Sequence, residues 1–276
     1  MFSNLPFIYF VEIFDYRFPI TTIFAFLNIF FFAVIALFCA KKFKLNFPAV
    51  FLMVLFTFVI SNVLSRIIFI FSRIYLHHDF EFQGRVFYFY TNQKVSIGFL
   101  FAIIIAIPLV IYIYSLKNKV GKYFDVFMLA YLSLFFVRLA GALTRYHPGK
   151  ITDSTWGTFY LGHYRHEPSL YEAVSLLLIF VISVLIIRKI KTDGLLALII
   201  LAWISFSRVI TDFFRSDDLL PASSKINNGF ETSNYRIENG LTLNQIFYFI
   251  LFLSAIGGIY WLLKRKNNLF REIKSN

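Results

Sequence analysis

The sequence is poor in cysteine and in charged residues. Cys39 is the only cysteine among 276 residues, which excludes a disulfide framework and a cysteine-rich zinc site. Only 15% of the residues are charged, whereas 59% are hydrophobic and 21% aromatic. This balance is far more apolar than a soluble domain of this length tolerates. The composition therefore predicts an all-α bundle of membrane-spanning helices.

Seven long apolar stretches are present, each close to the roughly 20 residues that a spanning helix needs. They cover residues 20–40, 48–71, 96–114, 124–143, 170–187, 195–214 and 243–263. No basic stretch precedes an apolar core near the start of the chain, so we expect no cleavable signal peptide. We expect one membrane domain over residues 1–276, with residues 1–19 forming an amphipathic arm at the surface.

Lysine and arginine gather in alternate connections, and this pattern predicts the orientation of the chain. The clusters follow the first, third, fifth and seventh apolar stretches, at Lys41, Lys42, Lys44, Lys117, Lys119, Lys122, Arg188, Lys189, Lys191, Lys264, Arg265, Lys266, Arg271 and Lys274. Those sides are expected to be cytoplasmic. The remaining connections, 72–95, 144–169 and 215–242, mix acids with bases and are expected outside, with the N-terminus outside and the C-terminus inside. The net charge of +12 thus orients helices, and we expect no nucleic-acid partner.

Three of the predicted spans contain one arginine each, namely Arg66, Arg138 and Arg208. An arginine within a span costs several kcal/mol unless it faces a partner, a wet cavity or a ligand. Each lies five or six residues before the predicted outer end, roughly 8–9 Å below the boundary at about 1.5 Å per residue. The matching depth favours a shared anion site, because guanidinium groups bind phosphate bidentately. The alternative is that each side chain reaches the interface independently.

Further polar residues surround the third of these arginines. Asp212 follows Arg208 by four residues and would pair with it on one helix face. Arg215 follows one turn further out. This arrangement fits an anion site and also fits a purely structural ion pair.

The connection 144–169 contains three histidines, His147, His163 and His166, which are potential proton carriers. His163 and His166 are three residues apart, but no carboxylate-rich helix accompanies them, so we expect no metal site. The sequence has neither a phosphate-cradling glycine loop nor a serine nucleophile motif. We therefore expect no cofactor.

The sequence RHEPSLYE at residues 165–172, which leads into an apolar stretch, resembles the RHPSQLYE signature of bacterial prolipoprotein diacylglyceryl transferases. Other family motifs follow in the same order along the chain. The stretch SRII at 65–68 is similar to GGRIGY, and SRVITDFFR at 207–215 is similar to FRxxxEFFR. Arg138-Leu139, Gly149 and Trp156-Gly157 match parts of GRxGNFxNxExxG…WG, and residues 241–245 resemble LTxGQ.

The resemblance implies that a diacylglyceryl group is transferred from phosphatidylglycerol to the lipobox cysteine of a prolipoprotein. The reaction would occur at the outer leaflet of the bacterial inner membrane, where a thioether forms and glycerol phosphate leaves. Arg138 and Arg208 match the essential, catalytic arginines of the family, which would hold the phosphate and stabilise the leaving group. The implied binding site for the lipid and the prolipoprotein signal peptide comprises Arg66, Arg138, Gly149, His166, Tyr171, Glu172, Arg208, Asp212 and Arg215.

Several polar positions of the family carry other residues in this chain. The histidine of the family's HGG motif aligns with Ile97, and of its two glycines only Gly98 is kept. The two asparagines and the glutamate of the GRxGNFxNxExxG motif align with Gly141, Thr144 and Tyr146. Since a thiol attacks as its thiolate and its pKa is about 8.5, the chain needs a base that the motifs do not assign. His163 and His166 are the candidates.

Two further functions remain open from the sequence. A non-catalytic relative would keep the phosphate-binding arginines and bind phospholipid or lipoprotein signal helices. A carrier or channel is disfavoured, because the predicted spans do not include a pair of helices interrupted by glycine or proline, which is typical of transport sites.

Overall fold

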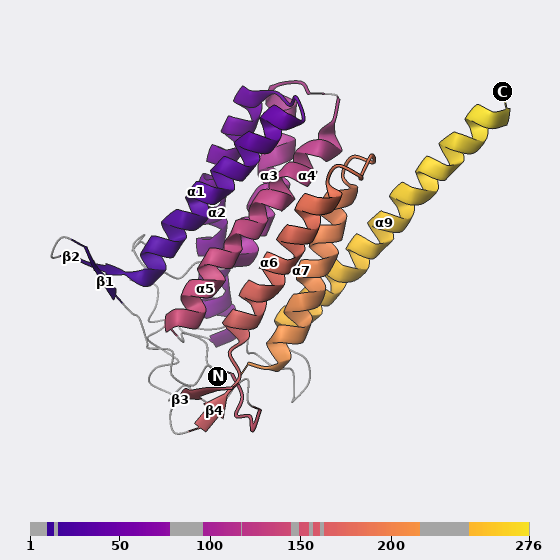
Figure 1. Cartoon of the computed structure of the whole chain (residues 1–276). Helices are drawn as coiled ribbons and strands as arrows, with labels where there is room; N and C mark the ends of the chain where they lie inside the picture. The colour runs from indigo at the N-terminus through magenta and orange to yellow at the C-terminus, as the bar shows by residue number, and fades with distance from the viewer. Residues whose placement is uncertain are drawn as a thin grey trace.

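The computed structural model describes residues 10–13, 16–77, 96–116, 118–144, 149–154, 157–160, 163–215 and 243–275. This part of the chain is mainly helical (Figure 1). The helices are α1 (Ile20–Lys42), α2 (Phe47–His77), α3 (Ser96–Ile113), α4 (Val120–Tyr131), the 3-10 turn η2 (Leu132–Leu134), α5 (Phe135–Thr144), α6 (Pro168–Ile186), α7 (Leu195–Phe213) and α9 (Leu243–Ser275).

All seven predicted apolar stretches are helical, and the all-α, multi-pass membrane fold is confirmed. Among the described residues, six helical segments are long and apolar enough to cross a bilayer, and Gly98–Ile113 of α3 is a shorter apolar helix. Large apolar side chains remain exposed on most of these helices, for example Phe26, Leu185 and Trp261. In a membrane protein such side chains face lipid, where exposure of apolar groups carries no penalty.

The fourth predicted span is broken near its middle. Its α4 and α5 parts are joined by the 3-10 turn η2, a geometry that is uncommon inside a long helix. The buried Ser133 hydroxyl donates to the Asn28 side-chain oxygen at 2.7 Å and lies 3.3 Å from the Asn28 backbone oxygen. This contact with α1 holds the turn, and Arg138 lies in the helix that begins directly after it.

The second span continues beyond its predicted end. Helix α2 ends at His77, six residues past the position expected from hydropathy. The additional residues are more polar but contain neither proline nor glycine, so nothing in the sequence stops the helix. As a result, Arg66 lies eleven residues before the end of its helix, whereas Arg138 and Arg208 lie six and five residues before theirs.

Two short antiparallel hairpins accompany the helices. Strand β1 (Phe10–Ile13) pairs with β2 (Tyr16–Pro19), with Phe10 opposite Pro19. Strand β3 (Thr158–Tyr160) pairs with β4 (His163–Arg165), with Thr158 opposite Arg165. An isolated bridge also joins Gly149 to Arg215, so the segment between α5 and α6 folds back onto the end of α7.

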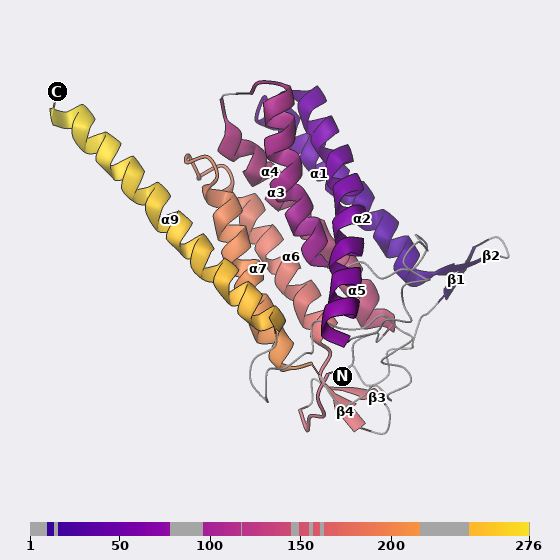
Figure 2. The same ribbon diagram turned by 180° about the vertical axis from the view of Figure 1, so that it is seen from behind.

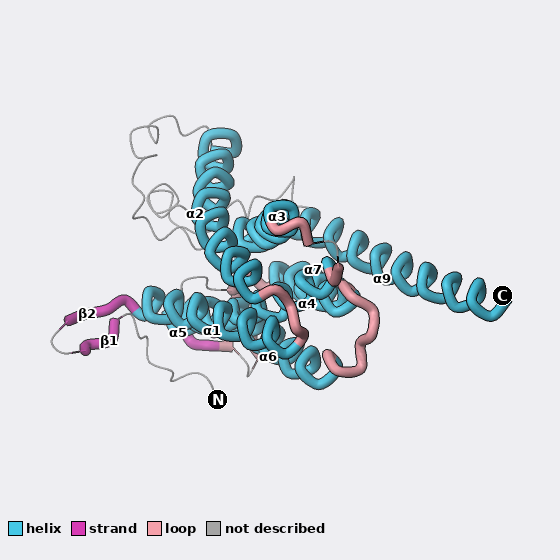
Figure 3. The backbone as a smooth tube through the Cα atoms, turned by 90° about the horizontal axis from the view of Figure 1, so that it is seen from above, coloured by secondary structure: helices cyan, strands magenta, loops and turns pink. Residues whose placement is uncertain are grey.

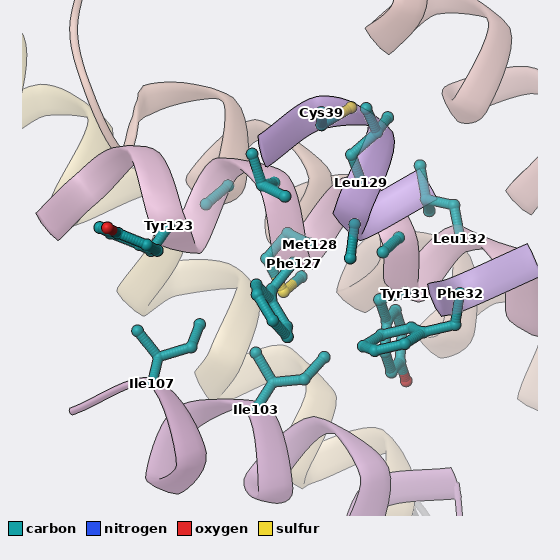
Figure 4. Packing of buried hydrophobic residues seen from close by; sticks show 14 of the residues in the cluster. Phe32, Cys39, Ile103, Ile107, Tyr123, Phe127, Met128, Leu129, Tyr131 and Leu132 are labelled. Carbon is teal, nitrogen blue, oxygen red and sulfur yellow. The ribbon is translucent and has the colours of Figure 1, made fainter. Parts of the chain in front are cut away.

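The core of the bundle is built largely from aromatic and branched side chains (Figure 4). The ring of Phe32 on α1 meets Phe99 on α3 and Phe127 on α4 edge to face, with centroids 5.1 and 5.7 Å apart. Phe99 also stacks on Tyr131 of α4 at 5.6 Å. Cys39 is buried in this core. Interdigitated rings supply the close contacts that hold helices together in lipid, where the hydrophobic effect between them is weak.

The connections with the lysine and arginine clusters lie at one end of the bundle, and hairpin β3–β4 lies at the other (Figure 1). At the lysine-rich end, Asp125 of α4 accepts backbone hydrogen bonds from Gly194 at 3.0 Å and from Ala197 at 2.8 Å. It thereby caps the start of α7, where backbone N–H groups have no partner within the helix. This contact fixes α4 and α7 relative to each other.

Helix α9 packs on α7 and then extends away from the other helices (Figures 2 and 3). Gly258 lets the two helices approach, because a Cβ atom there would lie 3.1 Å from a methyl carbon of Leu198. Side by side, α5, α6, α7 and α9 form the part of the bundle that positions the polar residues described below.

Candidate anion-binding site

Glu172, the fifth residue of α6, is buried and lies against three arginines. Its Oε2 atom is 2.9 Å from Nε of Arg138. Its Oε1 atom accepts hydrogen bonds from Nη1 of Arg208 and, at 3.0 Å, from Nη2 of Arg215. Charge-assisted hydrogen bonds of this kind are about twice as strong as neutral ones. One carboxylate thus joins side chains from α5, from α7 and from the residues just after α7.

Helix geometry explains why these side chains converge. Helix α6 packs against both α5 and α7, so a residue on α6 is able to reach both neighbours. Arg208, Thr211 and Arg215 follow one another at spacings of three and four residues, which places them on one face of α7 and its continuation. The Thr211 hydroxyl lies 3.3 Å from Oε1 of Glu172. The α7 face therefore presents two cations and a hydroxyl to the same carboxylate.

Among the residues that the structure describes, the ion pairs of this cluster join more positive than negative groups. Asp212 is buried and pairs with Arg215, with 3.3 Å between Oδ1 and Nε. In these described pairs, Arg138, Arg208 and Arg215 supply three cations, and Glu172 and Asp212 supply two anions. An excess of positive charge held away from bulk water favours binding of a further anion.

A small cavity adjoins the two arginines of α5 and α7. Its volume is about 20 Å³, and its lining residues are Tyr131, Leu134, Arg138, Glu172, Leu176, Ile204, Ser207 and Arg208. This space accommodates a water-sized group. A phosphate group is larger, so its entry requires side chains around the cavity to move. The guanidinium of Arg208 also lies over the ring of Tyr248, 5.6 Å from its centre, a favourable cation–π contact.

Gly149 holds together the segments that flank the cluster. Its N–H donates to the His166 carbonyl at 2.9 Å, and its own carbonyl accepts from Nη1 of Arg165 at 3.2 Å. A Cβ atom at this position would lie 2.5 Å from the His166 oxygen and 2.6 Å from the Phe214 oxygen. Only glycine fits such a close backbone approach. Gly149 therefore sets the position of the chain at Phe214 and Arg215, just after α7.

His166 and Tyr171 form an aromatic group beside the cluster. Nδ1 of His166 lies 3.1 Å from the Tyr171 hydroxyl. Both rings contact Phe214, with centroids 4.8 and 5.7 Å away. Partial burial, together with the positive charge of Lys150, lowers the pKa of His166 below its usual value. The imidazole is therefore neutral at pH 7 and has one ring nitrogen free to accept a proton.

The structure places most of the predicted site residues in one region. Arg138, Arg208, Arg215 and Asp212 belong to the cluster centred on Glu172. Gly149, His166 and Tyr171 lie in the adjoining segments. A shared carboxylate is not expected if Arg138 and Arg208 reach the interface independently, so their geometry favours the common site.

The side chain of Arg66 lies outside the part of the chain that the structure describes, as do His147 and Trp156. The backbone of Arg66 is in α2, next to the buried Ser65. A Cβ atom at Gly98 of α3 would lie 2.8 Å from the Ser65 backbone nitrogen, so Gly98 allows α3 to pack closely at this level. The contribution of Arg66 to the site stays a prediction.

Three residues around the cluster were not predicted from the sequence: Thr211, Tyr131 and Tyr248. Thr211 follows Arg208 by three residues, and Tyr131 precedes Arg138 by seven, so helical periodicity would have placed both on the right faces. Tyr248 comes from α9, and its approach to Arg208 depends on the packing of α9 on α7. No local pattern signals such a contact.

The fold and the cluster define a multi-pass membrane protein with a buried, cationic site between its helices. The family profile of prolipoprotein diacylglyceryl transferases matches residues 10–261, which is nearly the whole chain. The protein therefore belongs to the prolipoprotein diacylglyceryl transferase family.

Individual relatives are more distant. The phosphatidylglycerol–prolipoprotein diacylglyceryl transferase of Campylobacter lari is 26% identical over 201 residues, which cover 71% of this chain and 68% of that protein. The enzyme of the same name from Aliarcobacter butzleri is 34% identical over 111 residues, covering 39% of this chain and 41% of that protein. A Campylobacter jejuni relative is 30% identical over 126 residues, 45% of this chain and 42% of its own length.

Proposed function

We propose that the protein transfers the diacylglyceryl group of phosphatidylglycerol to the lipobox cysteine of a prolipoprotein, at the outer leaflet of a bacterial inner membrane. Membership of the family and the names of the relatives support this activity. The observation that carries the proposal is the convergence of Arg138 and Arg208, from two different helices, on the single carboxylate of Glu172.

The reaction replaces a carbon–oxygen bond with a carbon–sulfur bond. The cysteine thiolate attacks the carbon of the diacylglyceryl group that is bonded to the phosphate oxygen, and the bonding electrons leave with that oxygen as glycerol phosphate. Negative charge grows on that oxygen in the transition state. Guanidinium donors preorganised around it stabilise this charge, and the forked donor pattern of arginine fits the remaining phosphate oxygens.

Glu172 would act as a positioning residue in this reaction. Its carboxylate contacts Arg138, Arg208 and Arg215, and it offsets part of the repulsion between them while the phosphate is absent. Each guanidinium carries five donors, so an arginine that contacts Glu172 is able to donate to a phosphate at the same time. The carboxylate thus holds the guanidinium groups where they would contact a phosphate and reduces the repulsion between them.

A non-catalytic lipid-binding protein is the second candidate. Two observations favour it. The family's histidine, two asparagines and glutamate are replaced in this chain by Ile97, Gly141, Thr144 and Tyr146. The cavity beside Arg138 and Arg208 is also smaller than a phosphate group. Such a protein would retain phosphatidylglycerol or a lipoprotein signal helix through the same arginines without transferring the lipid.

One experiment separates the two candidates. The chain is expressed in cells depleted of their own transferase, and the mass of a reporter prolipoprotein is followed. Transferase activity predicts a diacylglyceryl mass gain that disappears with Arg138→Ala and with Arg208→Ala, but persists with Arg188→Ala at the opposite end of the bundle. No mass gain, together with arginine-dependent retention of phosphatidylglycerol by the purified protein, would instead establish the binding function.

A further inference from the structure

The reaction proposed above needs a base for the acceptor thiol, and the family's HGG histidine is replaced by Ile97. The sequence leaves His163 and His166 as candidates. The two residues lie in different environments. His163 is exposed at the start of β4, whereas His166 is partly buried between β4 and α6, with its backbone N–H donating to the Lys150 carbonyl at 3.0 Å.

The side chain of His166 is also held in place. Its ring packs on Phe214, and its Nδ1 atom meets the Tyr171 hydroxyl at 3.1 Å. If Nδ1–H donates to the tyrosine oxygen, the lone pair of Nε2 is free to accept a proton. A base whose second nitrogen is fixed by another side chain is the arrangement that activates nucleophiles in many enzymes.

The two residues that hold this ring are next in sequence to residues of the arginine cluster. Phe214 precedes Arg215, and Tyr171 precedes Glu172, and Arg215 and Glu172 form an ion pair at 3.0 Å. His166 therefore lies on the hairpin side of the cluster, where the chain between α5 and α6 meets the end of α7. An acceptor thiol that approaches a lipid phosphate in the cluster from this side would pass the imidazole.

We propose that His166, oriented by Tyr171, is the base that removes the proton from the acceptor cysteine. The proton moves from the thiol sulfur to Nε2, and the resulting thiolate forms the bond to the glycerol carbon. The electrons of the broken carbon–oxygen bond leave with glycerol phosphate. The proton then passes from the imidazolium to the departing phosphate or to water, which regenerates the neutral ring.

The charges around the ring suit this role. Within the described part of the chain, the charged and titratable groups that act on it are Lys150, in the segment after Gly149, and Tyr171 on α6, while Phe214 contributes an apolar face. The positive charge of Lys150 and partial burial disfavour the imidazolium. The ring is thus neutral at physiological pH, and general bases of this kind contribute about 10²-fold or more to a rate.

The test is a pH profile of transfer by the purified protein in mixed micelles of detergent and phosphatidylglycerol, with a synthetic lipobox peptide as acceptor. The wild-type rate is expected to fall in acid as the ring gains a proton, at a pH below the usual histidine pKa of about 6.5, because partial burial and Lys150 lower the pKa of His166. His166→Asn, which keeps a polar atom near the Nδ1 position, is expected to lower the rate about a hundredfold at pH 7. The deficit shrinks towards pH 9, where the thiol ionises unaided.

Two controls make the outcome specific. His163→Asn, three residues earlier in β4, is expected to keep the wild-type profile. Tyr171→Phe, which removes the hydroxyl that fixes Nδ1, is expected to give a smaller deficit that high pH also relieves, and it carries the test if His166→Asn does not fold. Retained phosphatidylglycerol is measured in each variant to show that the lipid site persists.

This inference rests on the proposed transferase activity, but different experimental results would overturn the activity and the role of His166. If the wild-type protein forms no product between pH 6 and 9, the transferase proposal itself fails. If the wild type is active and His166→Asn keeps its rate, or loses it by the same factor at every pH, His166 is not the base and only the inference is overturned.

Discussion

At the scale of single residues, the site depends on how one buried carboxylate is shared. Glu172 lies within 3.0 Å of donors from Arg138 and Arg215 and also accepts from Arg208. Cations packed this closely would repel one another without it. The same cations are the groups that would bind a lipid phosphate. Stability and function are therefore both expected to respond to changes at these positions, but in different ways.

Substituting Arg208 with lysine is expected to reduce transfer about 10²-fold or more, with little loss of folded protein. Lysine keeps the charge but loses the planar fork, so it is unable to donate to Glu172 and to a phosphate in the same geometry. The measurement is the rate of lipid transfer to an acceptor peptide at saturating phosphatidylglycerol. Arg188→Lys serves as the matched control, and equal rates for the two variants would refute a forked contact in the transition state.

Glu172→Gln is expected to destabilise the protein by about 3–5 kcal/mol, because it leaves buried cations without their counter-charge. Its shape is unchanged, so the effect would arise from charge. Unfolding in a denaturing detergent measures the difference, with Asp153→Asn as an exposed carboxylate control. Adding Arg215→Gln is expected to recover part of the lost stability, since one repelling cation is removed. An additive loss in the double variant would contradict this account of the cluster.

At the scale of elements, the structure depends on close contacts between segments far apart in the sequence. The junction at Gly149 joins the segment after α5 to residues 166 and 214 by backbone hydrogen bonds. The 3-10 turn η2 interrupts the α-helix of the fourth span, and Asp125 caps α7 from α4. Each contact fixes a helix or strand that presents a residue of the site.

Gly149→Ala is expected to cost about 1–3 kcal/mol, because its Cβ atom would meet two backbone oxygens at 2.5 and 2.6 Å and force the junction to shift. Transfer should fall as Arg215 is displaced. Thermal unfolding and transfer rate are measured together, with Gly257→Ala in α9 as the control, since a Cβ there meets nothing within 4 Å. Unchanged stability and rate for Gly149→Ala would show that the junction yields more easily than the geometry indicates.

Local sequence patterns predict some elements better than others. Hydropathy located all seven apolar helices because lipid exposure demands long apolar runs. It did not locate the end of α2, since a helix continues past its apolar part until a residue stops it. It also missed η2, where Ser133 donates a hydrogen bond to Asn28, 105 residues away in the sequence.

The candidate site was likewise predicted from the sequence only in part. A costly arginine in each of three spans pointed to Arg66, Arg138 and Arg208, and the structure describes the side chains of the last two. The RHEPSLYE motif pointed to Glu172 and His166. The role of Glu172 as the common partner of three arginines follows only from the packing of α5, α6 and α7. The contact of Arg208 with Tyr248 depends on α9 in the same way, so neither was predictable from spacing.

At the scale of the whole molecule, the basic clusters and the candidate site lie towards opposite ends of the bundle (Figure 1). The positive-inside rule assigns the basic end to the cytoplasm, which would place the arginine cluster towards the outer leaflet. In the proposed function, this orientation would bring the arginine cluster to the side on which a prolipoprotein presents its lipobox cysteine.

The orientation predicts which positions are reachable from outside the cell. In a Cys39→Ala background, Asp153→Cys in the segment between α5 and α6 is expected to react with a membrane-impermeant maleimide in intact spheroplasts. Lys189→Cys, between α6 and α7, should react only after lysis. Both positions are exposed, so access to the thiol depends on the side of the membrane. The reverse labelling pattern would invert the topology and remove the site from the outer leaflet.

We propose that the arginine cluster catalyses lipid transfer and does not merely hold the lipid. The decisive measurement is release of glycerol phosphate from phosphatidylglycerol by the purified protein, with and without a lipobox peptide. A catalytic cluster is expected to give release that depends on the peptide, equals the thioether formed, and is lost with Arg138→Ala and Arg208→Ala. Bound phosphatidylglycerol with no glycerol phosphate released in the presence of the peptide would contradict it.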